Sequence, residues 1–475
     1  MSDVIRFGSD GWRAVIAADY TFDNLRRVTQ ATADYFRREA GAADRGLVVG
    51  YDHRFASENF AAAAAEVLAG NGIPVYLATD PTPTPLISFA VLDRQTAGAV
   101  VITASHNPPA YNGFKVRDHR GVALPTAGLQ HIEARLPRAL SRVQRMPLPA
   151  AVDQGLIRRF DPAPAYTEYL ERCLDLEPIR QAGLKVVYDG MWGVGAGWLE
   201  RLLGGGATRI HPIRSQRHPL FPGMRQPEPI PPNVDALLAA VTETGADVGI
   251  ANDGDADRIG LADEQGRFVN QLQVAGLLAL YLLELRQQRG AIVKTLSSTV
   301  MLEHLGQRFG VDVFETAIDP KYIGPTVIET DALLGATESG GFLFRGLPER
   351  DGILAALYIL DLMVRTGKGL TQLLEQLYET VGARYSYGRI DTHFPAEQRA
   401  AIVRRLEEAR PQSVGGLTVT GRDTTDGFKF HLADGGWLLI RFSGTEPMMR
   451  FYCETAEASR VQVLLDEGLK LAGLV

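Results

Sequence analysis

The stretch AGAVVITASH, residues 97–106, is an apolar run typical of a strand that ends in a polar, turn-forming segment. Two similar runs precede it, RGLVVGYDHR at 45–54 and PVYLATD at 74–80, and the alanine-rich pattern at 58–72 between them is that of a helix. Strands that alternate with helices predict βαβ units and a sheet buried on both faces. Ligands of such sheets collect beyond the carboxyl ends of the strands. The polar residues after the third run are therefore the first candidates for a site.

The same rhythm occurs twice more along the chain, with helical patterns at 196–206 and 299–310. In each copy the third apolar run leads into an unusual polar loop, TASHNP, NDGDADR or TESGG, so we expect three domains to direct three loops into one cleft. The runs of the second copy are KVVYDGMWG (185–193), ATRIHPI (207–213) and ADVGIANDGD (246–255), and those of the third are GAIVKTLSS (290–298), VDVFETAI (311–318) and ALLGATESGG (332–341).

Proline-rich segments and a change of style near the end divide the chain further. Residues 141–165 read as a connection, and the six prolines of 219–232 predict a rigid surface loop. The last hundred residues look like strands with two helical patterns, which indicates an α+β domain. The sequence therefore predicts an α/β fold of three tandem α/β/α domains with mixed sheets, plus a smaller C-terminal α+β domain around one cleft. The expected domains are 1–145, 160–260, 261–375 and 383–475.

Composition excludes several classes of protein. The 475 residues carry a formal net charge of −7 and no evident basic stripe, which argues against a nucleic-acid binder. The two cysteines, Cys173 and Cys453, have no metal-type or disulfide spacing and predict reduced thiols in the cytoplasm. The start lacks the apolar core of a signal peptide, and the apolar stretch 273–285 is too short for a membrane span. We expect a cytoplasmic protein with a buried helix at that stretch.

The segment TASHNPPAYNGFKV, residues 103–116, suits covalent phosphoryl transfer. Ser105 should stand at a strand end, where an exposed hydroxyl needs a base nearby and positive charge around it. His106 and Lys115 are candidates for base, acid or charge. A common surface turn is the alternative interpretation, and the segment alone does not decide between the two.

The acidic motif NDGDADR, residues 252–258, predicts a metal site. Asp253, Asp255 and Asp257 alternate along the chain, so their carboxylates face one side and repel one another unless a cation neutralises them. An all-oxygen set favours Mg²⁺, Mn²⁺ or Ca²⁺. An EF-hand is a rival, but Arg258 stands where its glycine should be and a strand precedes the motif. A phosphatase of the haloacid dehalogenase type, with Asp253 as nucleophile, is a second rival.

Three further segments are candidates for binding anions or sugar hydroxyls. The loop RFSGTEPMMR at 441–450 offers backbone N–H groups, two hydroxyls and a guanidinium to a phosphate. FGSDGWR at 7–13 places Arg13 near a glycine turn, and TESGG at 337–341 offers Glu338 and Ser339. Each has an ordinary turn or helix cap as its alternative. Other candidates are Lys321, Arg350 and Asp351, for which an exposed charge is the default.

Taken together, FGSDGWR, TASHNP with GFK, DGDADR, ESGG and RFSGTEP resemble the motifs of the α-D-phosphohexomutases, the phosphoglucomutase and phosphomannomutase superfamily, in the family's order. The resemblance spans Phe7 to Arg450 and implies a cleft among four domains. It implies a Ser105 phosphoserine, Mg²⁺ held by Asp253, Asp255 and Asp257 with that phosphate, and acid/base chemistry at Lys115 beside His106. It further implies that Arg13 and Arg258 line the cleft. The residues implied to bind substrate are Lys321, Glu338, Ser339, Arg441, Ser443, Gly444 and Thr445.

The activity that the resemblance implies is interconversion of glucose 1-phosphate and glucose 6-phosphate through a hexose 1,6-bisphosphate. Within the family, glucose 1,6-bisphosphate synthase and phosphomannomutase are alternative activities, and a hexosamine-phosphate mutase is less favoured because of Trp12. An Asp-nucleophile phosphatase and a non-catalytic sensor are remote alternatives from other classes of protein. The expected partners are hexose phosphates and the bisphosphate, with no nucleic acid and no membrane, for a monomer or dimer. One departure concerns the sugar: Thr337 stands where the family's GExSG loop has its first Glu.

Overall fold

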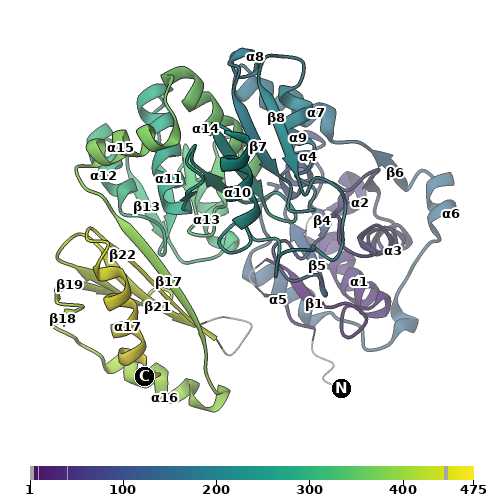
Figure 1. Ribbon diagram of the computed structural model, residues 1–475. Coiled ribbons are helices and arrows are strands. Elements are labelled where there is room, and N and C mark those ends of the chain that lie inside the picture. The colour runs from purple at the N-terminus through teal and green to yellow at the C-terminus, as the bar shows by residue number, and fades with distance from the viewer. Residues whose placement is uncertain (1–4, 9, 40, 443–447) are drawn as a thin grey trace.

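Four β-sheets follow one another along the chain, and helices flank each of them (Figure 1). The computed structural model describes residues 5–8, 10–39, 41–442 and 448–475. The first three sheets mix parallel and antiparallel strands, whereas every strand pair of the fourth is antiparallel. The predicted fold class, three α/β domains followed by an α+β domain, is confirmed.

The first three domains share one strand pattern. A central strand has two parallel neighbours, and the second neighbour turns back into an antiparallel partner. The polar loops predicted from the sequence connect that neighbour to its antiparallel partner, so they lie at equivalent edges of three sheets. In the first domain the four strands are β2 (Leu47–Tyr51), β3 (Val75–Ala78), β4 (Ala99–Ile102) and β5 (Tyr111–Arg117). In the second they are β7 (Lys185–Asp189), β8 (Arg209–Ile213), β9 (Val248–Asn252) and β10 (Ile259–Ala262). In the third they are β12 (Ile292–Thr295), β13 (Val313–Thr316), β14 (Leu334–Ala336) and β15 (Phe342–Phe344).

The first sheet is extended at both edges. Strand β1 (Trp12–Val15) pairs with β5, and β6 (Ile157–Phe160) pairs in parallel with β3. Strand β6 lies within the stretch 141–165 that the prolines assign to a connection, beyond the expected boundary at 145, because its residues continue the hydrogen-bonded ladder of β3. The helices of this region are α1 (Phe22–Glu39), α2 (Ala42–Arg45), α3 (Ser57–Gly70), α4 (Thr84–Asp93), α5 (Thr126–Ala134), the 3₁₀ turn η1 (Leu140–Arg142) and α6 (Leu148–Asp153).

The second and third domains add edge strands and the helices that cover their sheets. Strand β11 (Phe268–Val269) extends the second sheet and β16 (Leu347–Arg350) the third. The apolar stretch 273–285 forms α11 (Gln271–Leu280), which continues as the π-helical turn η2 (Tyr281–Leu285) and is largely buried, as expected. The other helices are α7 (Ala163–Cys173), α8 (Glu177–Gln181), α9 (Trp198–Leu203), α10 (Asp235–Thr244), α12 (Met301–Phe309), α13 (Pro320–Glu329), α14 (Gly352–Thr366) and α15 (Leu370–Val381).

The fourth domain is joined to the third by the long strand β17, which runs down from the neighbouring domain in Figure 1. It has an apolar core of its own, and a smaller cluster joins it to the third domain. In the preceding domains one core reaches from α4 through α7 and α9 to α14. Its elements are β17 (Ser386–His393), the 3₁₀ turn η3 (Ala396–Gln398), α16 (Arg399–Glu408), β18 (Ser413–Val414), β19 (Leu417–Asp423), β20 (Phe428–Leu432), β21 (Trp437–Phe442), β22 (Met448–Thr455) and α17 (Arg460–Ala472).

The proline-rich stretch 219–232 differs in part from the expected surface loop. It forms no helix or strand, but its residues 227–229 are buried rather than on the surface, because they pack against the acidic loop.

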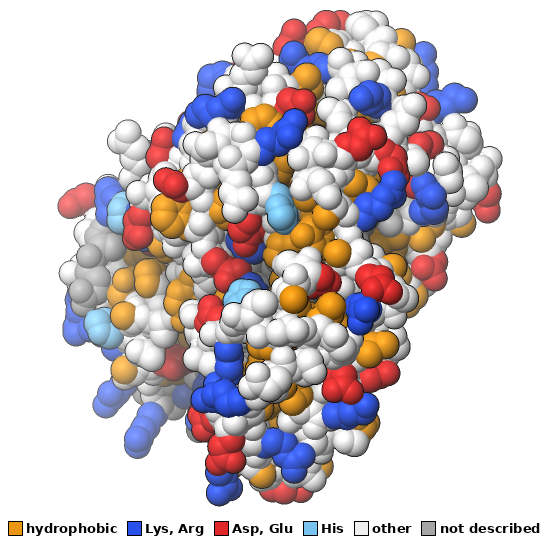
Figure 2. All heavy atoms as spheres, turned by 90° about the vertical axis from the view of Figure 1, so that its left-hand side faces the viewer, with side chains coloured by type: hydrophobic (Ala, Val, Ile, Leu, Met, Phe, Trp, Pro, Cys, Tyr) orange, Lys and Arg blue, Asp and Glu red, His pale blue; other side chains and the backbone are white. Residues whose placement is uncertain are grey.

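In the described part of the chain, every helix is too short or too polar to span a bilayer. Figure 2 shows acidic and basic side chains interspersed on one face, where the coloured residues form no continuous basic band.

Candidate active site

Ser105 occupies a strained turn directly after β4. Its φ of 50° lies in the left-handed region, which non-glycine residues seldom adopt. The backbone N–H of Ser105 donates to Thr103 Oγ1 at 2.8 Å, and the Ser105 carbonyl accepts from the Arg54 guanidinium at 2.7 Å. Arg54 is itself fully buried and also donates to the carbonyls of Pro108 and Tyr111. These contacts fix the turn and aim the Ser105 hydroxyl away from its own strand.

The hydroxyl of Ser105 faces the acidic loop of the second domain. Ser105 Oγ donates to Asp253 Oδ2 at 2.8 Å, and both side chains are buried. The backbones meet just as closely, since a Cβ atom on Gly254 would lie 2.5 Å from the Ser105 carbonyl oxygen. Thr84 Oγ1, at the start of α4, donates to Asp255 Oδ2 at 2.6 Å. The boundary between the two domains therefore brings the predicted nucleophile and the predicted metal ligands together.

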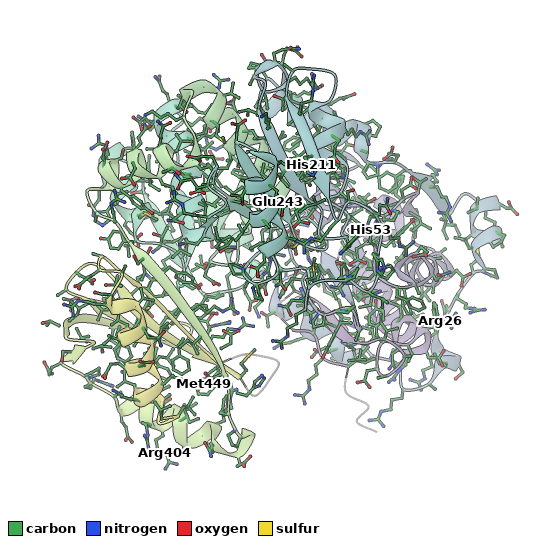
Figure 3. The ribbon with its side chains drawn as sticks, in the orientation of Figure 1. Arg26, His53, His211, Glu243, Arg404 and Met449 are labelled. Carbon is green, nitrogen blue, oxygen red and sulfur yellow. The ribbon has the colours of Figure 1, made fainter. Side chains whose placement is uncertain are left out.

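His53 fixes the same boundary from another loop. It is labelled in Figure 3 between the first and second domains, and its Nδ1 lies 3.2 Å from the carbonyl oxygen of Trp192. Arg217 adds hydrogen bonds from the second domain to the His53 and Arg54 carbonyls, at 3.1 and 3.2 Å. Several independent contacts thus hold the Ser105 loop against the acidic loop.

Each of the three carboxylates of the acidic loop contacts donor groups of the protein. Asp253 Oδ1 accepts the N–H groups of Asp257 and Arg258 at 3.0 and 3.1 Å. Lys115 Nζ lies 2.7 Å from Asp255 Oδ2 and 3.3 Å from Asp257 Oδ2. The Oδ1 atoms of Asp255 and Asp257 are buried and accept no hydrogen bond from the described residues. One oxygen from each carboxylate lies within 4.8 Å of the others.

The electrostatics of this triplet fit a hard divalent cation. Burial, followed by repulsion from Asp255 and Asp257, holds the pKa of Asp253 well above its usual range. Burial also acts to raise the pKa of Asp255, but the Lys115 ammonium outweighs it and the pKa is lowered. Orphaned, buried carboxylate oxygens are costly without a partner, and a cation bound by oxygen ligands removes that cost. The residues present are therefore able to hold a metal ion.

Lys115 is the centre of a buried charge network. Its ammonium also lies 3.1 Å from Asp10 Oδ2, and although burial opposes the charge, Asp10, Asp255 and Asp257 raise the pKa of Lys115 overall. Asp10 in turn contacts Arg117 at 2.8 Å and Arg350 at 2.9 Å. Lys115 is thus held as a cation whose proton points at the acidic triplet.

Arg350 and Glu349 connect that network to the third domain. Arg350 lies 2.6 Å from Asp257 Oδ2, and Glu349 pairs with Arg117. Asp351, the other candidate of this segment, caps α14 by accepting the N–H groups of Ile353 and Leu354. Arg350 therefore lies at the site, whereas Asp351 has a structural role.

His106 lies beside the Ser105 hydroxyl, and the charges of Arg13 and Arg258 act on His106. His106 Nδ1 lies 3.4 Å from Ser105 Oγ, and burial, together with the charges of Arg258 and Arg13, holds the pKa of His106 well below its usual range. The imidazole is therefore neutral at pH 7. Arg13 donates to Asn107 Oδ1 at 2.5 Å, and Arg258 pairs with Glu228 of the proline-rich stretch at 3.1 Å.

The TESGG loop packs beside the acidic loop, because the Ile259 N–H donates to the Gly340 carbonyl at 2.9 Å. Thr337 closes the loop on itself: its hydroxyl donates to the Gly341 carbonyl at 2.8 Å and accepts the Gly341 N–H at 3.0 Å. Ser339 Oγ lies 3.2 Å from that hydroxyl. Glu338 is therefore the one acidic side chain of the loop, and it turns toward the fourth domain.

Arg441 and Lys321 lie where the third and fourth domains meet. Arg441 donates to Asp426 Oδ1 at 3.0 Å and to the Ile318 carbonyl at 3.1 Å, which places it near the start of α13 and Lys321. Lys321 Nζ lies 3.6 Å from Asp319. Ser443, Gly444 and Thr445 fall outside the described residues.

Sequence reasoning missed Asp10, Arg54 and Thr84 as parts of the site. Asp10 lies inside FGSDGWR, where only Arg13 was predicted to contact an anion. Arg54 follows the first apolar run, just as Ser105 follows the third. Arg54 follows the strand-end rule that identified the other loops, whereas Asp10 precedes β1. Thr84 had no comparable signal, because a threonine between prolines is typical of an ordinary helix start.

Comparison with known proteins gives the same picture for the whole chain. The four domains of the phosphoglucomutase/phosphomannomutase family, alpha/beta/alpha domains I, II and III and the C-terminal domain, match residues 4–142, 164–266, 270–381 and 396–470. A phosphoglucomutase/phosphomannomutase from Thermococcus kodakarensis is 29% identical over 466 residues, 98% of each chain. A probable phosphoglucosamine mutase from Methanothermobacter thermautotrophicus is 31% identical over 460 residues, which cover 96% of this chain and 95% of that protein.

A solved structure extends the likeness to three dimensions. A protein from Thermus thermophilus, provisionally named a phosphomannomutase, superposes with a TM-score of 0.85 at 36% identity and covers 99% of both chains. Profile matches over most of the chain, full-length relatives and a shared architecture agree with one another. The chain therefore belongs to the phosphoglucomutase/phosphomannomutase family, the α-D-phosphohexomutases, whose members are intramolecular phosphotransferases of the isomerase class.

Proposed function

We propose that this phosphohexomutase interconverts glucose 1-phosphate and glucose 6-phosphate through a phosphorylated Ser105 and a glucose 1,6-bisphosphate intermediate. The observation that carries the proposal is the 2.8 Å contact between Ser105 Oγ and Asp253 Oδ2, within a buried triplet that also pairs with Lys115. A serine hydroxyl, a set of hard oxygen ligands and a buried cation are the parts that phosphoryl transfer requires.

The reaction consists of two transfers that balance each other. Phosphoserine 105 gives its phosphoryl group to the free hydroxyl of the hexose monophosphate, so the Ser105 oxygen is the leaving group and the bisphosphate forms. After the sugar turns over, its other phosphoryl group returns to the Ser105 oxygen and the isomeric monophosphate is released. Lys115 exchanges the proton of the reacting sugar hydroxyl, while Arg13 and Arg258 offset phosphate charge. Neutral His106 lies within reach of the Ser105 oxygen.

Mg²⁺ is the metal that we propose for the acidic triplet. Asp253, Asp255 and Asp257 would hold it, because their carboxylate oxygens lie close together and are the hard ligands that Mg²⁺ prefers. When bound, the ion neutralises charge on the transferring phosphoryl group. The Lys115 ammonium lowers the pKa of Asp255 and so keeps that carboxylate ionised, which is the state that a cation requires of its ligands.

Glucosamine phosphate is the second candidate substrate, since several relatives, at 28–31% identity, are named as phosphoglucosamine mutases. The altered TESGG loop bears on the same choice: Thr337 uses its hydroxyl for loop closure, so Glu338 and Ser339 remain to bind sugar hydroxyls. Release of the bisphosphate would instead make the enzyme a glucose 1,6-bisphosphate synthase.

The test is an assay of the purified protein with Mg²⁺ on the 1-phosphates of glucose, mannose and glucosamine, with and without glucose 1,6-bisphosphate. We expect the largest kcat/KM with glucose 1-phosphate and little free bisphosphate during turnover. A preference for glucosamine or mannose phosphate would assign the other sugar, and accumulation of bisphosphate would identify the synthase.

Mapping of the phosphorylated residue separates the mutase from a phosphatase. After incubation with bisphosphate and an acid quench, we expect an acid-stable phosphate on Ser105. A labile acyl phosphate on Asp253 would contradict the proposal and make that carboxylate the nucleophile.

A further inference from the structure

The side chain of Glu338 joins the TESGG loop to the fourth domain. Its Oε1 accepts a hydrogen bond from the Tyr387 hydroxyl at 2.5 Å, and the Arg389 NH1 lies 3.4 Å from the same oxygen. Both partners come from β17, two residues apart, so they share one face of the strand. The Glu338 side chain is 11% exposed, and its Oε2 has no hydrogen bond from the described residues. One oxygen is therefore held, which leaves the second for another partner.

The groups that hold Glu338 are themselves fixed. Asp391 accepts both Nε and NH2 of Arg389 at 2.8 Å, which leaves NH1 to face Glu338. Tyr387 packs against an apolar cluster that includes Leu272 of the third domain and Trp437 of the fourth. A preorganised donor pair of this kind loses little entropy when it orients a carboxylate. The loop is thus positioned by residues that belong to a different domain.

We propose that Tyr387 and Arg389 are positioning residues that act through Glu338 and set the hexose selectivity of the enzyme. The inference deepens the proposed function and rests on it, because it assigns the free oxygen of Glu338 to the sugar hydroxyls. Thr337 cannot take this role while its hydroxyl closes the loop. The fourth domain has a core of its own and packs on the third domain, so its docking brings Tyr387 and Arg389 to the Glu338 carboxylate.

The chain offers a matched control for the test. Tyr385 lies two residues before Tyr387, and its hydroxyl also bonds the third domain, at 3.0 Å from His304 Nε2, but not the TESGG loop. Tyr387→Phe and Tyr385→Phe each remove one hydroxyl from the same interface and keep the ring that packs there. A difference between the two variants therefore reports the contact with Glu338 rather than general loosening of the domain.

The experiment measures kcat and KM of the full-length enzyme for the glucose, mannose and glucosamine 1-phosphates. For Tyr387→Phe we expect KM to rise about tenfold, the loss typical of a hydrogen bond to a charged group, with kcat changed by less than about twofold. The ratio of kcat/KM between sugars should shift by about threefold or more. Tyr385→Phe should change neither quantity, and Arg389→Lys, which keeps the charge but loses the fork, should be intermediate.

A second readout needs no turnover. Amide hydrogen exchange of residues 337–341 should be faster in Tyr387→Phe than in wild type and unchanged in Tyr385→Phe. Equal exchange and equal sugar ratios in wild type and Tyr387→Phe would overturn the inference. If the wild type turns over no hexose phosphate, the proposed function and the selectivity role fail together, while faster exchange would still establish the positioning contact.

Discussion

Ser105 Oγ lies 2.8 Å from Asp253 Oδ2, although the two residues are 148 positions apart and belong to different domains. That distance places the proposed nucleophile directly beside the residues proposed to hold the metal ion. The relationship is built by packing of the loops after β4 and β9, each placed at the same edge of its own sheet. The chemistry proposed for the enzyme depends on this contact before any other.

Replacing the nucleophile tests the contact most directly. Ser105→Ala should lower kcat by at least about 10³-fold, because no other hydroxyl takes the phosphoryl group. Incubation with labelled bisphosphate should then leave the variant unlabelled. Thr29→Ala removes a buried hydroxyl whose hydrogen bond lies within α1, and it should retain activity. Normal turnover by Ser105→Ala would refute the covalent route.

The close approach of the two loops predicts an effect of a single methyl group. Gly254→Ala would place a Cβ atom 2.5 Å from the Ser105 carbonyl oxygen, so the loops must separate. We expect kcat to fall at least about 100-fold, since small displacements of reacting groups carry penalties of that size. Gly245→Ala, at an exposed left-handed position with open space, should lower stability by about 1 kcal/mol without loss of activity. Activity assays with thermal melts of both variants distinguish the two effects.

Asp10 positions the cations of the site and has no predicted contact with substrate. Asp10→Asn removes the charge that holds Lys115, Arg117 and Arg350 together, so Lys115 should lose its orientation. We expect kcat to fall by about 10- to 100-fold, with phosphorylation of Ser105 still detectable. Asp23→Asn, on the exposed side of α1, serves as the control. An unchanged kcat for Asp10→Asn would show that Lys115 is held by the triplet alone.

The Thr337 hydroxyl makes the sugar loop sensitive to substitution. Thr337→Glu should shift sugar preference, as the family pattern implies, but it should also raise KM several-fold because both hydrogen bonds to Gly341 are lost. Thr337→Ser keeps the hydroxyl and should behave like the wild type. The measurement is kcat/KM for three hexose phosphates with each variant. A Thr337→Glu enzyme with wild-type preference would contradict the role given to this loop.

The junction of the third and fourth domains should depend on pH through Glu454. Burial is the largest influence on this carboxyl and, against hydrogen bonds from Thr299 and the Val300 N–H, raises its pKa from the usual 4.5 to about 7. Folding therefore favours the protonated form of Glu454. The contribution of this carboxyl to the free energy of unfolding is fully present below pH 4.5 and is lost as the pH rises through about 7. The loss amounts to about 3 kcal/mol.

Urea unfolding measured at several pH values between about 4.5 and 8 checks the Glu454 prediction. The wild type should lose stability across that window, and Glu454→Gln, which cannot ionise, should lose about 3 kcal/mol less. Parallel curves for the two proteins would exclude Glu454 as the titrating group.

Much of the fold could be predicted because strand patterns are local. The runs ending at Ser105, Asp253 and Glu338 alternate with helices, and that periodicity alone predicts the three similar sheets. The C-terminal strands were recognised for the same reason. Strand β6 was missed because its residues, between two proline-rich segments, acquire their strand identity only by pairing with β3.

The site was predictable in its chemistry but not in its connections. Ser105 and the three aspartates follow buried strands, so their places could be inferred from sequence. The pairing of Asp10 with Arg350, and of Glu338 with Tyr387, joins residues that no local pattern relates. Long-range contacts of this kind depend on how whole domains dock, which is a property of their surfaces and not of any single motif.

The recurrence of one strand arrangement in three domains has a consequence for how such an enzyme can change. Each copy delivers a single loop, and in the function proposed above the loops have separate roles: the first carries the transferred group, the second balances its charge, and the third contacts the sugar. Substitutions in the third loop can therefore redirect the enzyme to a new hexose while the other two conserve the reaction. Diversification of the substrate and preservation of the chemistry are assigned to different copies of the same architectural unit.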